Sequence, residues 1–121
     1  MEQKFIIGDI VMYDNKIMVV KEHRDGCHFD LFCPKEGLVY CLVDIDEIKP
    51  VRLTPEILVK NGWKLDDATW IYKKGYIKVF RLLDNKTYAA YMLGVRVFEF
   101  HFIHQLQHLL FGLGLSSEME V

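Results

Sequence analysis

Turn dipeptides recur at short intervals along this chain, and they separate runs of β-forming residues. Asp14-Asn15 divides Ile10–Tyr13 from Lys16–Glu22, and Asp25-Gly26 precedes the run CHFDLFC. Asn, Asp and Gly adopt the backbone conformations of tight hairpin turns, while β-branched and aromatic residues favour strands. The pattern therefore predicts a small, bent antiparallel sheet in the first half of the chain.

A fourth run, GLVYCLV, follows a turn at Pro34–Gly37. Gly8-Asp9 opens the first strand, and this start followed by a meander is similar to SH3-like barrels. We therefore predict an SH3-like β meander over residues 1–53. Such a likeness carries no function by itself.

A short helix is predicted to link this meander to the rest of the chain. Thr54 is a good N-cap, Pro55 suits the first helical position, and Asn61-Gly62 closes the end. The runs TWIYKKGYIKVFRLL, TYAAYML and VRVFEF then predict a second antiparallel sheet.

The predicted fold class is α+β. It comprises an N-terminal SH3-like β meander, a short linking helix and a second antiparallel sheet packed by a C-terminal helix. We expect subdomains at 1–53 and 54–121 within one compact domain, since 121 residues is the size of one ordinary domain.

Charge is distributed unevenly along the chain. Residues 1–53 hold seven basic and ten acidic residues, whereas residues 70–100 hold six basic and two acidic ones. The second sheet is therefore locally basic although the whole chain has a net charge of −2. A basic sheet favours a phosphate-bearing partner, and a solvated sheet face is the simpler interpretation.

The three cysteines, Cys27, Cys33 and Cys41, lie near His23 and His28. Their odd number and their spacing suit neither a disulfide framework nor a zinc site anchored by a Cys-x-x-Cys pair. We therefore predict free thiols and no metal or cofactor. No segment resembles a signal peptide or approaches the roughly 20 apolar residues of a membrane span, so a cytoplasmic location without membrane attachment is expected.

Three histidines crowd the sequence FEFHFIHQLQHLLFGL. On a helix, the apolar residues from Phe102 to Leu113 form one stripe, and His101, His104, Gln105 and His108 form the opposite one. A solvated face is the simplest interpretation. A polar recognition surface, a zinc site using His104 and His108, and acid–base catalysis by one histidine are alternatives. No nucleophile elbow, phosphate loop or dinucleotide glycine motif accompanies them, so an enzyme is not expected.

The C-terminal FIHQLQHLLFGLGL resembles endings of the type VHQLQNLYFALTGEEL. Such endings occur in a group of small uncharacterised proteins of Bacteroides-type phages and mobile elements. The middle of the chain, IKPVRLTPEILVKNGWK, also matches the group's pattern I-P-L-T-E-E-W-L-x-K-x-G-F. The matching residues are Pro50, Leu53, Thr54, Glu56, Leu58, Lys60, Gly62, His104, Gln105, Leu106, Gln107 and Leu109. The chain departs from the group at Pro55 and in its tail, Gly114–Glu118.

This resemblance implies a phage or mobile-element protein in a bacterial host cytoplasm. We hypothesise a non-enzymatic counter-defence protein, a homo-oligomeric sponge that sequesters a host nucleotide immune signal. Aromatic rings would stack on the base, basic groups would hold phosphate, and the histidine face would line the pocket or a subunit contact. The candidate ligand-binding residues are Trp70, Tyr72, Lys73, Arg81, Arg96, His101, His104, Gln105 and His108.

Two other binding functions stay open from the sequence. One is a protein–protein inhibitor of a host defence enzyme, which would need an exposed apolar patch. The other is an SH3-like nucleic-acid-binding module, which the acidic first half of the chain disfavours.

Overall fold

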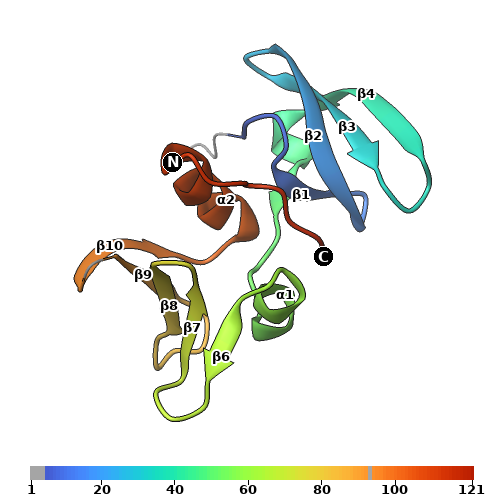
Figure 1. The fold of residues 1–121 in the computed structure, drawn as a ribbon. Coiled ribbons are helices and arrows are strands. Elements are labelled where there is room, and N and C mark those ends of the chain that lie inside the picture. The colour runs from blue at the N-terminus through green and yellow to red at the C-terminus, as the bar shows by residue number, and fades with distance from the viewer. Residues whose placement is uncertain (1–4, 93) are drawn as a thin grey trace. The chain divides into compact units, whose positions relative to one another are not determined.

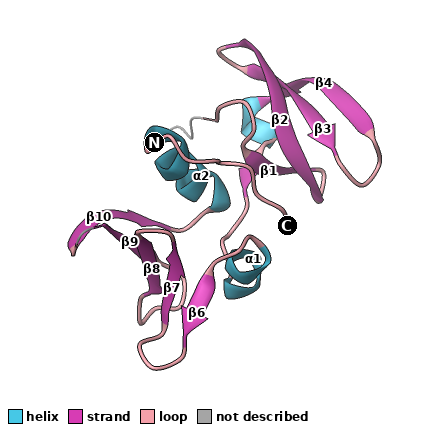
Figure 2. Cartoon of the chain, viewed as in Figure 1, coloured by secondary structure: helices cyan, strands magenta, loops and turns pink. Residues whose placement is uncertain are grey.

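A computed structural model describes residues 5–92 and 94–121, with only the backbone of Arg96 and Val97. It is an α+β structure with two antiparallel five-stranded sheets (Figures 1 and 2). The chain divides into two compact units. Unit 1 comprises residues 1–51 and 102–119, and unit 2 comprises residues 52–101 and 120–121.

The sheet of unit 1 has the order β4-β3-β2-β1-β5. Its strands are β1 (Ile10–Tyr13), β2 (Lys16–Asp25), β3 (His28–Cys33), β4 (Leu38–Asp44) and β5 (Lys49–Pro50), with a 3₁₀ helix η1 (Ile45–Glu47) before β5. Asp14 and Asn15 both have positive φ, 52° and 58°, which is the geometry of the tight turn predicted between β1 and β2. The four-strand meander is confirmed, and its SH3-like character stays a prediction.

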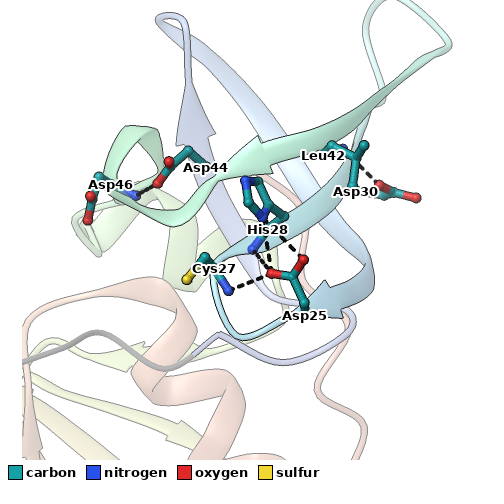
Figure 3. Close-up of polar contacts among 7 residues, drawn as sticks. All are labelled: Asp25, Cys27, His28, Asp30, Leu42, Asp44 and Asp46. Atoms are coloured by element: carbon teal, nitrogen blue, oxygen red, sulfur yellow. Dashed lines mark hydrogen bonds and ion pairs between the residues drawn. The ribbon is translucent and has the colours of Figure 1, made fainter.

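The core of unit 1 is built mainly from the strands of this meander. Its buried residues are Phe5, Val11, Met18, Val20, Phe29, Leu31, Cys33, Val43 and Ile48. Asp30 is also buried, and its carboxylate accepts from the Leu42 N–H at a bulge in β4 (Figure 3) and from Arg24. A buried carboxylate needs such partners, so Asp30 fixes the bulge.

Helix α2 (Ile103–Gly112) belongs to unit 1. The Gln107 amide accepts from Ile10 N–H at 2.8 Å and donates to the carbonyl oxygens of Gly8 at 2.9 Å and Ser117 at 3.0 Å. These bonds join α2 to β1. The expected boundary between subdomains 1–53 and 54–121 therefore differs from the observed division, in which residues 102–119 complete unit 1.

The sheet of unit 2 is a meander of order β10-β9-β8-β7-β6. Its strands are β6 (Lys64–Asp66), β7 (Ile71–Lys74), β8 (Ile77–Arg81), β9 (Tyr88–Met92) and β10 (Val95–Phe100). Helix α1 (Pro55–Lys60) precedes them, with the Thr54 hydroxyl accepting from Ile57 N–H and Asn61 at the C-cap. The predicted linking helix and its caps are confirmed.

No helix within residues 5–92 and 94–121 combines the length and the apolar character that a membrane crossing requires.

Candidate functional site

The sheet of unit 2 has one buried face and one face with polar and aromatic side chains. Residues directly opposite each other on paired strands share a face, and successive residues alternate. The inner face carries the buried residues Tyr72, Ile77, Val79, Tyr88, Ala90 and Phe100. The outer face carries Lys64, Asp66, Ile71, Lys73, Lys78, Phe80, Ala89, Tyr91 and Glu99.

Three lysines lie side by side on the outer face. Lys64 of β6 is opposite Lys73 of β7, and Lys73 is opposite Lys78 of β8. Lys78 in turn is opposite Tyr91 of β9. We call Lys64, Lys73 and Lys78 the lysine row. The row crosses the neighbouring strands β6, β7 and β8, and the next residue in line on β9 is Tyr91.

Tyr91 stacks on Phe80, with ring centroids 4.8 Å apart and planes inclined by 24°. We call these two residues the aromatic pair. Ala89, the residue opposite Phe80 on the neighbouring strand, is small and fully buried. A hollow of about 380 Å³ is lined by the aromatic pair together with Ile71, Tyr76, Lys78 and Gly94. Its volume and its mixed apolar and cationic lining suit a small planar ligand that carries negative charge.

The charges of the lysine row are only partly neutralised. Lys73 Nζ lies 3.5 Å from the Asp66 carboxylate. A hydrogen bond from the Ala68 N–H, with the Thr69 hydroxyl and the Lys73 charge nearby, holds the pKa of Asp66 below its usual value. In the part of the chain that the structure describes, neither Lys64 nor Lys78 forms an ion pair. Like charges directly opposite each other destabilise a sheet, so this arrangement favours an added anion.

Among the site residues predicted in unit 2, only Lys73 has a described side chain on the outer face. Tyr72 is buried on the inner face, and Arg81 donates to the carbonyl oxygen of Asn85 at 3.2 and 3.3 Å. Trp70 precedes β7 with 71% of its surface exposed. The backbone of Arg96 is opposite Tyr91, and its side chain lies outside the described residues. Unit 2 also includes the exposed His101.

His104, Gln105 and His108 lie on α2 in unit 1. The prediction of a solvated histidine stripe is wrong for His104, which is only 3% exposed and contacts the Phe5 ring. His108 is half-buried and bonds through Nε2 to the Asp9 carboxylate at 2.8 Å. Gln105 accepts from Phe102 N–H at the start of the helix. These three polar groups therefore serve the packing and capping of α2.

Asp9 is buried beside this helix. Burial raises the pKa of Asp9, while bonds from Ile6 N–H and His108 oppose that rise. Sequence reasoning singled out neither Asp9 nor Gln107 for this junction. It also missed Lys64, Lys78 and Phe80 as site residues, because the register of the strands decides which side chains share a face.

The cysteine and histidine cluster of unit 1 is spread out. His28 Nδ1 lies 3.0 Å from the Asp25 carboxylate, which also accepts from the Cys27 N–H (Figure 3). Cys27 and Cys41 are exposed free thiols, and Cys33 is buried. His23 stacks on Phe29 at 4.6 Å. Across residues 5–92 and 94–121, no group of three or more His, Cys, Asp or Glu side chains is arranged to hold a metal ion.

Comparison with protein-family models, with curated proteins and with solved structures finds no match for this chain.

Proposed function

We propose that this protein binds a nucleotide-type ligand without catalysing its conversion, and that the outer face of unit 2 is the binding site. The observation that carries the proposal is the register that places the lysine row next to the aromatic pair. Rings offer a stacking surface to any base, and lysines attract phosphate. Together they supply a contact for the base and a contact for the phosphate of a nucleotide.

The biological setting that we propose is sequestration of a host nucleotide immune signal by a phage or mobile-element protein. This setting rests on the resemblance of the HQLQ helix and of the central segment, not on the geometry of the site. A sponge protein works by binding its ligand stoichiometrically. It therefore needs high affinity and abundance, and it needs no catalytic turnover. A homo-oligomer in the host cytoplasm would fit that role, because each subunit brings one outer face.

Substitution of Tyr91 by leucine tests the binding site. We expect the wild-type protein to be stabilised against heat by nucleotides, because a ligand that binds only the folded state stabilises it. Loss of one ring contact should weaken binding by about 5- to 150-fold, which corresponds to roughly 1–3 kcal/mol for a stacked base. Thermal-shift titrations with a panel of cyclic, linear and ADP-ribose nucleotides measure this change.

Phe111→Leu is the matched control, since Phe111 is an exposed aromatic residue of unit 1. Native mass spectrometry of the purified protein, followed by denaturation, would identify any nucleotide that copurifies and the number of subunits. Unchanged melting of the wild type with every nucleotide in the panel would refute the proposal. If Phe111→Leu weakens nucleotide binding as much as Tyr91→Leu does, the site cannot be assigned to unit 2.

A further inference from the structure

The lysine row extends in one direction away from the aromatic pair. Neighbouring strands of a sheet lie about 4.8 Å apart. Lys78 is one strand from Tyr91, Lys73 is two strands away, and Lys64 is three. The backbone positions of the three lysines are thus roughly 5, 10 and 14 Å from that of Tyr91 along the sheet. The cations form a line that leads away from the stacking surface.

A base stacked at the aromatic pair brings its own first phosphate only to the near end of this line. In a cyclic mononucleotide the single charge stays next to the sugar, within reach of Lys78. Additional phosphates in a linear chain are needed to place negative charge beside Lys73 and Lys64. The length of the row therefore discriminates between ligands by the number of phosphates in line.

The far end of the row also has space for such a chain. A second hollow, of about 350 Å³, is lined by Lys64 and Lys73 together with Gly62, Leu65, Asp66, Lys74 and Gly75. Lys74 Nζ already donates to the carbonyl oxygen of Asn61 at 2.9 Å, and Lys73 is partly engaged by Asp66. Lys64 is left as the cation of this hollow with the fewest described partners, so it is the residue most suited to a terminal phosphate.

Repulsion between the lysines of the row also favours a ligand with several phosphates. Each opposite pair, Lys64 with Lys73 and Lys73 with Lys78, places like charges on adjacent strands. A single phosphate would relieve the repulsion at one end only. A chain of phosphates parallel to the row would relieve it along the whole length.

We propose that the ligand is a nucleoside that carries two or more phosphates in a linear chain. The base stacks at the aromatic pair, and the chain runs past Lys78 and Lys73 toward Lys64. This inference rests on the proposed function, since it concerns the same site. It adds the ligand class: linear polyphosphorylated nucleosides are preferred over cyclic mononucleotides.

Calorimetric titration with adenosine and guanosine mono-, di- and triphosphates and with the two 3′,5′-cyclic monophosphates tests the proposal. For the wild type we expect the triphosphate to bind roughly tenfold or more tightly than the cyclic compound with the same base, because each added phosphate gains a charge-assisted contact. Lys64→Gln should abolish most of this gain and weaken triphosphate binding far more than monophosphate binding. Lys78→Gln should weaken binding of all phosphorylated ligands.

Lys86→Gln is the matched control, because it removes one positive charge from a turn of unit 2 outside the row. Circular dichroism of each variant establishes that it is folded. A short 5′-hydroxyl oligoadenylate distinguishes the source of the phosphates: Lys64-dependent binding tighter than that of the triphosphate assigns the linear chain to an oligonucleotide.

Two results would overturn the proposal and leave the binding function intact. One is equal affinity for the triphosphate and the cyclic monophosphate in the wild-type protein. The other is a gain from added phosphates that Lys64→Gln and Lys86→Gln reduce to the same extent. Absence of binding by every nucleotide would overturn both the ligand class and the proposed function.

Discussion

His104 is a histidine inside the protein rather than on its surface. It contacts the rings of Phe5, Phe102 and His108 in unit 1. Burial, and secondarily the charge of His108, lowers the pKa of His104 from 6.5 to about 4. Protonation is therefore easier in the unfolded chain than in the folded protein. The stability that His104 contributes is complete above pH 6.5 and is lost as pH falls toward 4.

We predict that the free energy of unfolding falls by about 2 kcal/mol between pH 7 and pH 5 through His104 alone, since one pKa unit corresponds to 1.36 kcal/mol. Urea titrations of the wild type and of His104→Gln at both pH values measure this. The variant should show a flatter pH dependence. Burial raises the pKa of Asp9, so Asp9 acts in the opposite sense, and the comparison of the two proteins isolates His104.

The control is His101→Gln, because His101 is an exposed histidine of unit 2. It should lose far less of the wild-type pH dependence than His104→Gln does, because the His101 side chain is exposed. If His104→Gln loses as much stability on acidification as the wild type does, the pH dependence originates elsewhere.

At the scale of elements, the charges on the outer face of unit 2 oppose folding, and the binding that we propose would relieve them. The lysine row brings like charges into opposite positions on β6, β7 and β8. A sheet selected only for stability would alternate the signs of these charges. The lysine row therefore lowers the stability of the ligand-free sheet, and a bound polyanion would offset that loss.

We predict that Lys78→Gln raises the free energy of unfolding of the ligand-free protein by roughly 0.2–1 kcal/mol while it weakens nucleotide binding. The stabilisation should shrink in high salt, because salt screens exposed charges. Denaturant titrations at low and high ionic strength measure it, with Lys86→Gln for comparison. A destabilised Lys78→Gln at low salt would show that repulsion in the row is negligible.

Local signals in the sequence predict the elements well. Thr54 and Pro55 start α1, and Asp14-Asn15 turns the first hairpin, because each acts through bonds to residues a few positions away. The buried face of α2 could not be predicted in the same way. It includes His104 and Gln107, and the bonds of Gln107 go to Gly8 and Ile10, far away in the sequence.

The candidate site, too, could be predicted only in part, because its composition is visible locally but its geometry depends on contacts between strands. The excess of basic residues over 70–100 is visible from the sequence and predicts a basic sheet. The lysine row, which begins at Lys64 outside that range, depends on the register of three strands. Tyr72 was predicted to stack on a base, but the register turns it to the inner face opposite Val79.

At the scale of the whole molecule, most of unit 2 is inserted in the sequence between the two segments of unit 1. The chain leaves unit 1 after Val51 and returns at Phe102. Unit 1 thus depends on α2, which supplies partners to Gly8, Asp9 and Ile10.

A fragment of residues 1–53 should therefore lack cooperative thermal unfolding, since buried backbone groups of its first strand lose their partners. We expect a synthetic peptide of residues 102–119 to restore a transition when it is mixed with the fragment. Circular dichroism melts measure both states, and a peptide with Gln107→Leu serves as the control. A fragment that melts cooperatively without the peptide would contradict this dependence.

The bond between Ile10 and Gln107 joins residues that are 97 positions apart. A ribosome synthesises β1 well before α2, so the two cannot meet while the residues between them are being made. Residues 52–101, by contrast, form nearly all of unit 2 as one continuous stretch. The stretch 52–101 can thus fold while unit 1 still lacks α2, so the unit whose synthesis starts first is not the first to have its main contacts in place.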